Sequence, residues 1–359
     1  MTSTGTISRH ICSQSFGTVS LLARTVWQSF AWGQVGSGRN DGPAIRRLAQ
    51  PNSPSQVLVQ LVSLWKAELP ARIFIRNPCV IMTIPTRPQA ELEKTYNAAA
   101  DHYDQPAVSF WDRFGRRTVD RLPLFTGMTV LDVCCGMGAS AIPAAERVGP
   151  TGQVIAVDIA EKLLNKGSRR ATEQGLTNIE FRQADLENLP FPDRAFDAVL
   201  CVFGIFFVSD LRGAIRKLWQ LVRPSGLLAI TIWGRGPFEP ADGIFWEAVR
   251  REDPELFRSI NPWSKIFEPD PLCALLLECG VSDPEAVAEQ GWHPLRAPED
   301  WWTIVLGSGY RSTVEALLPA NRERVRSAAI AGVRQAEIRQ IRTDVVYGTA
   351  RRAKLRPAL

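Results

Sequence analysis

A chain of 359 residues is long enough for two average domains or for one large α/β domain with additions. Its hydrophobic content of 45% suits a globular protein with a sizeable core, and apolar runs such as 201–208 are too short to span a bilayer. The net charge of +5 is unevenly spread: residues 1–81 carry eight Lys/Arg and two Asp/Glu, whereas the remainder carries 34 and 35. The near-neutral remainder gives no electrostatic footprint for a nucleic-acid partner.

Residues 1–81 differ in character from the rest, being rich in Ser, Thr, Gly and Arg without a sustained period. Three interpretations fit this basic extension: a stretch upstream of a start at Met82, an organelle-targeting peptide, or a poorly ordered tail. The seven cysteines are odd in number and form no C-x-x-C pair. They therefore predict neither a disulfide framework nor a metal site, and they favour a reducing, cytoplasmic compartment.

From about residue 90 the pattern becomes regular. Apolar spacing predicts a helix over 91–103 and another over 110–122. Strands and helices then alternate, which predicts βαβ units and a mostly parallel sheet. The expected elements are strand 128–134, helix 140–148, strand 153–158, helix 161–174, strand 178–183, strand 196–203, helix 210–222 and strand 226–233.

After residue 234 the order becomes looser. We expect helices near 243–251 and 271–279, a strand around 286–293, helical segments over 298–306 and 312–338, and a last strand over 342–351. The expected fold class is α/β: a Rossmann-like, seven-stranded, mostly parallel sheet with helices on both faces and a helical cap. We expect this domain over 90–355, with cap insertions at about 235–282 and 294–340.

A glycine turn follows the first strand of the alternating region. Residues 136–141 fit G-x-G-x-x-G/A, and Asp158 lies 20 residues after Gly138, which superficially matches a dinucleotide-binding fingerprint. Such a strand–turn–helix unit places a ligand at the carboxyl end of the sheet, beside a helix N-terminus. However, Asp132 stands at the strand tip, where its charge would repel a pyrophosphate. The turn alone therefore leaves the cofactor open.

Three acids, Asp132, Asp158 and Asp185, end successive predicted strands. They suit a ligand with a cationic end, a ribose and an adenine but no phosphate. Asp158 can accept from both ribose hydroxyls, Asp185 from an exocyclic amine, and Asp132 can neutralise an ammonium group. That ligand is S-adenosylmethionine. A single such Asp is more often a turn former or a helix cap, so the prediction depends on the series.

The chain here resembles the class I S-adenosylmethionine-dependent methyltransferases, specifically their ubiquinone/menaquinone-type small-molecule branch. The resemblance covers about 95–233 and is carried by VLDVCCGMG (130–138), VIAVD (154–158), ADLENLPFPDRAFDAVLCVFGIFFVSD (184–210) and LVRPSGLLAIT (221–231). Cys134 stands where the family usually has its first glycine, and Ser225 departs from the usual K/R-P-G-G turn. The resemblance implies that the cofactor contacts Asp132, Cys134, Gly136, Gly138, Asp158, Ile159, Asp185 and Leu186.

The segment after the fourth strand bears on the acceptor. Residues 201–207 are apolar and aromatic and lack the D/N-P-P-Y/F signature of many amine and amide methyltransferases. This favours a small, partly apolar or aromatic acceptor, methylated at carbon or oxygen. Phe206 and Phe207 suit simple core packing equally well.

Two segments are candidates for covering the site, the helix at 95–104 and the segment 292–318. Tyr96 and Tyr103 are seven residues apart on the helix expected over 91–103 and would share a face. Because an N-terminal helix often lids the cofactor in the family, both are candidate cofactor contacts. His102 is a candidate catalytic base, although a solvent-facing position also fits it.

His293 is a second candidate catalytic base and lies near the end of a predicted strand. Trp292, Trp301 and Trp302 could form an aromatic wall for the acceptor or could anchor the cap. Two other functions are compatible with these residues: an NAD(P)-dependent oxidoreductase, and a non-catalytic S-adenosylmethionine-binding accessory protein. The pattern does not indicate the oligomeric state.

Overall fold

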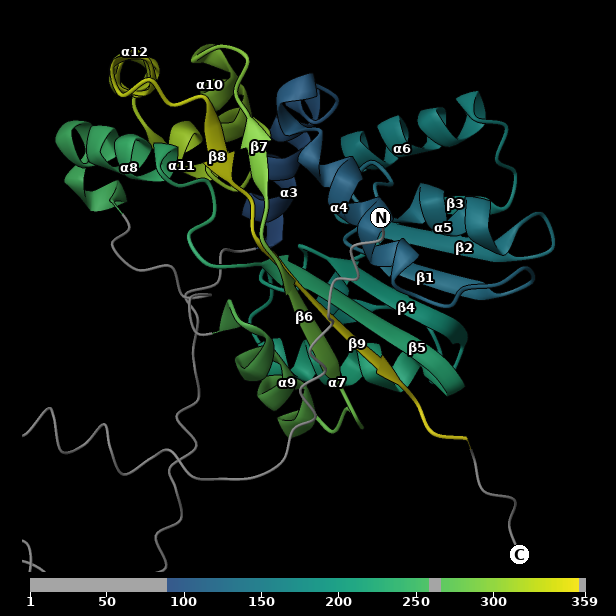
Figure 1. Cartoon of the computed structure of the whole chain (residues 1–359). Helices are drawn as coiled ribbons and strands as arrows, with labels where there is room; N and C mark the ends of the chain where they lie inside the picture. Colours follow the sequence, from purple (N-terminus) through teal and green to yellow (C-terminus); the bar gives the residue numbers. More distant parts are fainter. Residues whose placement is uncertain (1–88, 258–265, 355–359) are drawn as a thin grey trace, which may run out of the picture. The chain divides into compact units, whose positions relative to one another are not determined.

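The computed structural model describes residues 89–257 and 266–354, and the predictions made for residues 1–81 lie outside them. Its main feature is a seven-stranded sheet in the order β3-β2-β1-β4-β5-β9-β6 (Figure 1). Only β9 runs antiparallel to its neighbours, β5 and β6. The expected Rossmann-like α/β fold class is confirmed. The strands are β1 Thr129–Val133, β2 Gln153–Asp158, β3 Ile179–Gln183, β4 Phe196–Val202, β5 Val222–Trp233, β6 Glu285–Glu289 and β9 Val345–Arg351.

The strand order reverses at β1. This strand pairs in parallel with β2 on one side and with β4 on the other, so that Val133 lies opposite both Val157 and Cys201. In open α/β sheets such a switch point opens a crevice at the carboxyl ends of the strands, because the following helices leave to opposite faces. The sheet therefore places the predicted cofactor turn at its natural ligand-binding edge.

Helices cover both faces of the sheet. One face packs against α4 Phe110–Asp120, α5 Ala141–Val148 and α6 Glu161–Glu173, and the other against α7 Leu211–Leu221 and α9 Pro269–Glu278. The alternation of side chains along a strand produces this division, since Val130 of β1 faces one layer and Leu131 faces the other. Both side chains are completely buried.

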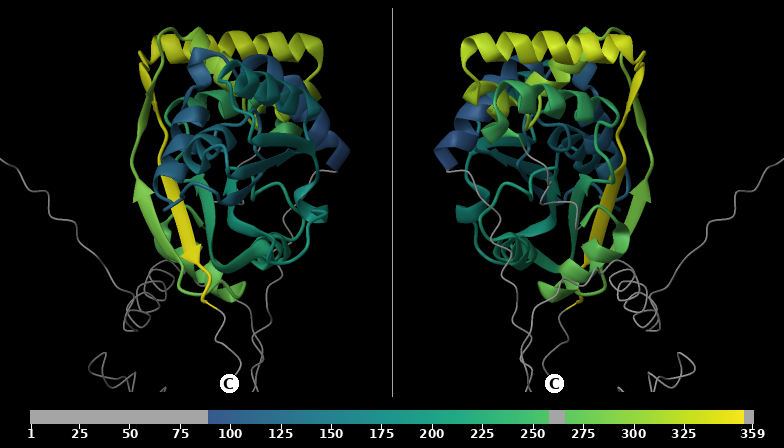
Figure 2. Two further views of the ribbon diagram at one scale, coloured as in Figure 1. Left: turned by 90° about the vertical axis from the view of Figure 1, so that its right-hand side faces the viewer. Right: turned by 90° about the vertical axis from the view of Figure 1, so that its left-hand side faces the viewer.

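A second apolar core lies in the cap, which comprises four helices and a two-stranded sheet beyond the carboxyl edge (Figure 1). Figure 2 shows α12 lying across this end of the domain in both views. Fully buried Phe245 and Trp301 contribute to the core, which also takes in Tyr347 of β9 and Phe203, the residue after β4. The cap elements are α8 Ala241–Glu252, η4 Pro254–Leu256, β7 Trp292–Pro294, α10 Glu299–Leu306, α11 Arg311–Ala316, α12 Pro319–Gln335 and β8 Gln340–Arg342.

The chain enters the domain through a lid formed by α3 Gln89–Ala99 and the short turns η1 Ala100–His102 and η2 Pro106–Val108. The α-helix expected over 91–103 therefore ends at Ala99, and the short turn η1 follows it. The backbone N–H of Lys162 donates to Asn97 Oδ1 at 2.9 Å, which ties the lid to the first turn of α6. A last short turn, η3 Leu186–Asn188, follows β3.

Three predicted elements differ from the structure because the chain crosses from sheet to cap. The helix expected over 312–338 divides into α11 and α12, since Leu317 and Leu318 are extended and Pro319 starts the second helix. The strand expected over 286–293 divides into β6 and β7, and that expected over 342–351 into β8 and β9. At this crossing the backbone N–H of Gly291 donates to Asp344 Oδ1 at 3.0 Å.

The span expected to form the first cap insertion, 235–282, divides between two layers. Its helix α8 packs against α12 in the cap, whereas α9 packs against β6 and β9 with Leu272 and Leu276 buried in the sheet's core. Within the described parts of the chain, we find no helix that combines the length and apolarity needed to cross a membrane.

Candidate active site

The glycine turn after β1 is held in left-handed backbone conformations. Cys134, Gly136 and Gly138 have φ values of 59°, 55° and 88°. This backbone conformation is strained for Cys134, although it would not be for glycine, and such strained residues concentrate at functional sites. The backbone N–H of Cys135 donates to the carbonyl of Val157 at 3.0 Å, so the turn is fixed to the end of β2.

Asp132 is fully buried just before this turn. Its Oδ2 accepts a hydrogen bond from the Ser140 hydroxyl at 2.7 Å, whereas its Oδ1 has no partner among the described residues. Burial, with a smaller contribution from nearby Asp158, raises the pKa of Asp132 to about 7, although the Ser140 bond opposes the shift. A buried acceptor without a partner is costly, so this oxygen is suited to a cationic ligand or its bridging water.

Asp158 ends β2 and caps two loops. Its Oδ2 accepts from the Gly136 N–H at 2.8 Å and its Oδ1 from the Ala160 N–H at 2.9 Å. Burial raises its pKa, and these backbone bonds oppose that shift. The residue as a whole is 8% exposed. Because each carboxylate oxygen has two lone pairs, Asp158 can still accept from a ligand while it shapes the turn.

Asp185 follows β3 and starts η3. Its Oδ1 accepts from the Glu187 N–H at 3.1 Å and its Oδ2 from the Asn188 side-chain amide at 2.9 Å. The Ala184 N–H donates to the Asp158 carbonyl at 3.0 Å, which brings the ends of β2 and β3 together. The structure thus gathers the three predicted carboxylates along one edge of the sheet. Buried Leu186 and half-buried Ile159 accompany them.

The lid tyrosines lie over this edge. Their rings meet edge-on with centroids 6.4 Å apart, even though the helix that was expected to align them stops between them. A Cβ built on Gly136 would come within 3.9 Å of Tyr103 Cε1 and meet nothing closer, so the ring faces an open side of the turn. Tyr96 also contacts Phe207 at 5.3 Å, and Phe207 is 36% exposed.

Comparison with known proteins identifies the chain. A methyltransferase domain family matches residues 130–226. Aklanonic acid methyltransferase from Streptomyces is 33% identical over 204 residues, which is 54% of this chain and 92% of that protein. The chain belongs to the S-adenosylmethionine-dependent methyltransferase family. The family that the sequence motifs predicted is therefore confirmed.

Two further relatives of this methyltransferase match over a smaller part. Nocamycin O-methyltransferase from Saccharothrix syringae is 33% identical over 45% of this chain and 62% of its own length. The ubiquinone/menaquinone biosynthesis C-methyltransferase from Pseudomonas fluorescens is 41% identical over 33% of this chain and 46% of its own length. The matched region thus spans about half to three-fifths of these two proteins.

The methyltransferase's edge residues fit S-adenosylmethionine. The partnerless Asp132 Oδ1 suits the ammonium group, directly or through water, and Asp158 suits the ribose hydroxyls. Gly136 offers its backbone without a Cβ between Asp158 and Tyr103. Leu186 and Ile159 provide apolar surface beside Asp185 for the adenine. The individual contacts remain predictions, but the residues present match the chemistry of the cofactor.

The two candidate bases are placed differently. His102 belongs to the lid, next to Tyr103; its Nδ1 is buried without a partner among the described residues, and burial and Arg311 lower its pKa. His293 is 5% exposed on β7, with its ring edge-on to Phe110 at 5.1 Å. Burial and the Arg113 charge lower the pKa of His293. The structure therefore puts His102 in the lid, within electrostatic reach of Arg311, and His293 within the packing of the cap.

An aromatic wall that the sequence did not predict lies beside the lid. Tyr103 stacks on Trp111 at 5.8 Å with an interplanar angle of 5°, and Trp111 contacts Trp233 at 5.5 Å. Trp233 stacks on Phe203 at 4.3 Å, and Phe203 has a φ of 56° at the end of β4. The sequence singled out Phe203, within the aromatic segment 201–207, and Tyr103 of the lid, but neither Trp111 nor Trp233.

The tryptophans proposed for such a wall lie elsewhere. Trp301 and Trp302 are 0% and 8% exposed in the cap core, as anchors would be, and Trp292 is 50% exposed on the surface. Phe206 is 5% exposed in the sheet's core, which matches simple packing, whereas Phe207 meets the lid.

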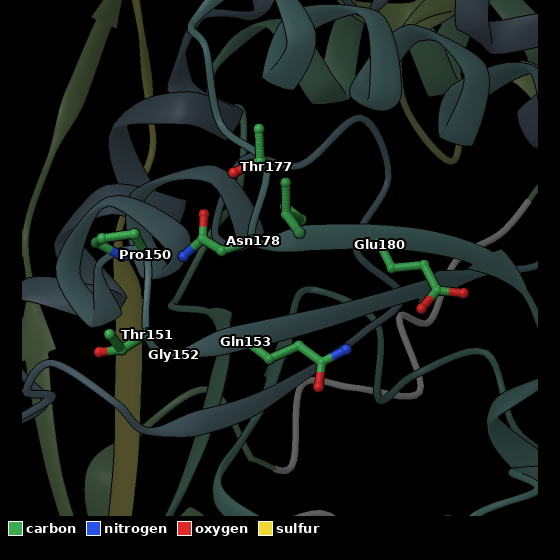
Figure 3. Close-up of a pocket in the computed structure, with 8 residues that line it drawn as sticks. Pro150, Thr151, Gly152, Gln153, Thr177, Asn178 and Glu180 are labelled. Carbon is green, nitrogen blue, oxygen red and sulfur yellow. The ribbon is translucent and has the colours of Figure 1, made fainter.

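A polar recess of about 450 Å³ lies at the opposite edge of the sheet, where β2 and β3 begin (Figure 3). Its Asn178 side chain already donates to the carbonyls of Ala145 and Gly149 at 2.9 and 2.8 Å. The recess is thus separated from the three carboxylates by the length of the strands, and we assign it no part in methyl transfer. Its lining consists of Pro150, Thr151, Gly152, Gln153, Thr177, Asn178, Ile179 and Glu180.

Proposed function

We propose that this methyltransferase acts on a small, flat acceptor with apolar or aromatic character, and that it methylates carbon or oxygen. The observation that carries the proposal is the aromatic wall of Tyr103, Trp111, Trp233 and Phe203, which runs from the lid to the end of β4. Trp111 and Trp233 keep accessible surface although they lie against the cap core. Aromatic faces of this kind suit stacking against a planar acceptor.

The relatives support the same acceptor class. One is named for aklanonic acid, one is an O-methyltransferase for nocamycin and one is a C-methyltransferase of quinone biosynthesis. All three names refer to small molecules rather than to nucleic acids or proteins. They leave carbon and oxygen as the methylated atoms, in agreement with the absence of a polar amine clamp after β4.

S-adenosylmethionine supplies an electrophilic methyl group when bound. The protein's task is to hold the acceptor in line with that group and to exclude water. Tyr96 and Tyr103 cover the turn, and burial keeps the pKa of Tyr103 well above its ordinary value, so its phenol stays neutral. For an acceptor that must lose a proton, we propose His102 as the base, because its lowered pKa leaves the imidazole neutral at pH 7.

We also propose the wider organisation of the protein. We propose that residues 90–355 form one methyltransferase domain and that its cap covers the acceptor. The described cysteines are all free thiols, which supports a reducing, cytoplasmic location. The near-neutral body supports a small-molecule rather than a nucleic-acid partner.

An acceptor screen with radiolabelled S-adenosylmethionine tests the proposal. Quinols, phenols and fatty acyl compounds are compared, with Asp158→Ala as the control that lacks the ribose ligand. We expect transfer to a phenol or quinol and at least a hundredfold loss in the variant. Transfer only to fatty acyl compounds would contradict the aromatic acceptor. Binding of the cofactor without transfer to any compound would favour an accessory protein.

A further inference from the structure

A buried acid–phenol pair lies at the cap end of the aromatic wall. The Tyr310 hydroxyl donates to Asp242 Oδ1, and the Trp246 ring lies against that of Tyr310 with centroids 5.7 Å apart. Asp242 and Trp246 belong to α8, whereas Tyr310 precedes α11 (Figure 1). We call Asp242 and Tyr310 the cap pair. Nothing in the proposed methyl-transfer chemistry accounts for it.

The cap pair is enclosed yet accessible. Four aromatic rings surround that of Tyr310, with centroids 5.1 to 6.0 Å from its own. They belong to Phe238, Phe245, Trp246 and Trp301. Burial raises the pKa of both acidic groups. Nevertheless Asp242, Trp246 and Tyr310 each keep accessible surface. A few polar groups set among aromatic side chains are typical of a ligand-binding site.

A continuous series of ring contacts joins the cap pair to the cofactor edge. Tyr310 contacts Phe238 at 5.9 Å, and Phe238 contacts Trp233 at 4.9 Å. Trp233 belongs to the aromatic wall that reaches Trp111 and Tyr103. The cap pair and the lid thus lie at the two ends of one connected series of aromatic side chains.

The cap pair has spare hydrogen-bonding capacity. A carboxylate offers about four lone-pair positions, and the Tyr310 hydroxyl occupies one of those on Asp242. A ligand hydroxyl can therefore donate to Asp242 in a charge-assisted bond. A purely structural pair that joins α8 to the loop before α11 would need no such reachable acceptor.

We propose that the cap pair is the polar anchor of the acceptor site, where Asp242 accepts a hydrogen bond from a hydroxyl group on a fused-ring aromatic acceptor. This inference rests on the proposed function and adds the acceptor group that is recognised. Asp242 and Tyr310 set acceptor specificity and take no part in the transfer itself.

Calorimetric titration of the full chain, saturated with S-adenosylhomocysteine, tests the anchor with 2-naphthol and naphthalene as probes. We expect wild type to bind 2-naphthol about tenfold more tightly than naphthalene. In Asp242→Asn this preference falls below about threefold, and in Tyr310→Phe it takes an intermediate value. Glu247→Gln, on the same helix but paired with surface arginines, is the matched control and keeps the tenfold preference.

Three results would overturn the anchor: a wild type without preference for the hydroxyl, neither probe binding to the cofactor-loaded protein, or an undiminished preference in Asp242→Asn. If Asp242→Asn fails to fold, Tyr310→Phe decides, and an unchanged preference there overturns the proposal. The affinity for S-adenosylhomocysteine should stay within twofold of wild type in every variant. A wild type that does not bind S-adenosylhomocysteine would overturn the proposed function itself, which separates the two failures.

Discussion

The buried carboxylate of Asp132 should make the ligand-free protein less stable at neutral and higher pH, because in the absence of the cofactor its charge has no cationic partner among the described residues. Its pKa of about 7 compares with about 3.9 for a carboxyl group in an unfolded chain. Between these values the folded state keeps a proton that the unfolded chain has released. The contribution of Asp132 to stability therefore decreases as the pH rises from about 4 to about 7.

The size of this effect follows from the pKa difference. At pH 8 the raised pKa of Asp132 lowers the free energy of unfolding by about 4 kcal/mol. At pH 5, where the side chain is protonated in the folded state, it lowers that free energy by only about 1.5 kcal/mol. Asp132→Asn removes the charge and leaves an oxygen to accept from Ser140. The substitution also places an amide in the partnerless position, and that cost is the same at both pH values.

We therefore expect the change in free energy of unfolding caused by Asp132→Asn to be about 2 to 3 kcal/mol more favourable at pH 8 than at pH 5. Urea unfolding of the ligand-free protein at the two pH values measures it. The same variant should bind S-adenosylhomocysteine at least tenfold more weakly at pH 8. Wild-type affinity should decrease by up to about tenfold per pH unit below 7, because the ammonium group favours the charged carboxylate.

Two results would refute this reasoning. The first is an equal effect of Asp132→Asn on stability at pH 5 and pH 8, which would mean that Asp132 does not titrate in this range. The second is an unchanged affinity for S-adenosylhomocysteine in the variant, which would separate Asp132 from the cofactor.

Gly115→Ala would put a Cβ 2.3 Å from the Ala139 carbonyl oxygen, so we expect it to cost about 2 to 3 kcal/mol in urea unfolding and to weaken S-adenosylhomocysteine binding. Gly243→Ala, where a Cβ meets nothing within 4 Å, should be neutral or slightly stabilising, and equal effects at both sites would contradict the close packing of α4 on the turn. His102→Gln should lower kcat at least tenfold with unchanged cofactor affinity, and an unaltered kcat would exclude it as the base. His293→Gln should instead lower the melting temperature, and a large loss of kcat in a stable variant would reverse the two assignments.

The sheet and its cofactor edge could be predicted from the sequence because their determinants are local. Strand β2 has the predicted bounds, and the acids fall at strand ends because each apolar run stops there. The structure adds that Asp158, besides bonding the nearby Ala160 N–H, accepts from the Gly136 N–H, a contact across 22 residues that no spacing reveals. The meeting of Tyr96 with Tyr103 was expected from a continuous helix, but a tighter turn after Ala99 brings it about.

The cap could not be predicted to the same depth. Its aromatic wall joins residues more than a hundred positions apart, such as Trp111 and Trp233, and tertiary packing alone decides which rings stay accessible. The paired tryptophans at 301 and 302 were the more visible signal in the sequence, yet they serve as buried anchors. Helix α9 likewise joins the sheet because Leu272 and Leu276 face its core, a distinction that requires the strand order.

Calorimetric titration with S-adenosylhomocysteine, NADH and NADPH tests the central claim, that the carboxylates at the sheet edge bind S-adenosylmethionine. The wild type should bind S-adenosylhomocysteine at one site per chain and give no heat with either dinucleotide. Asp158→Ala should weaken that binding by at least about a hundredfold, since it removes the two charge-assisted bonds that we propose to the ribose hydroxyls. Binding of NADH or NADPH in its place, or unchanged affinity in Asp158→Ala, would contradict the account.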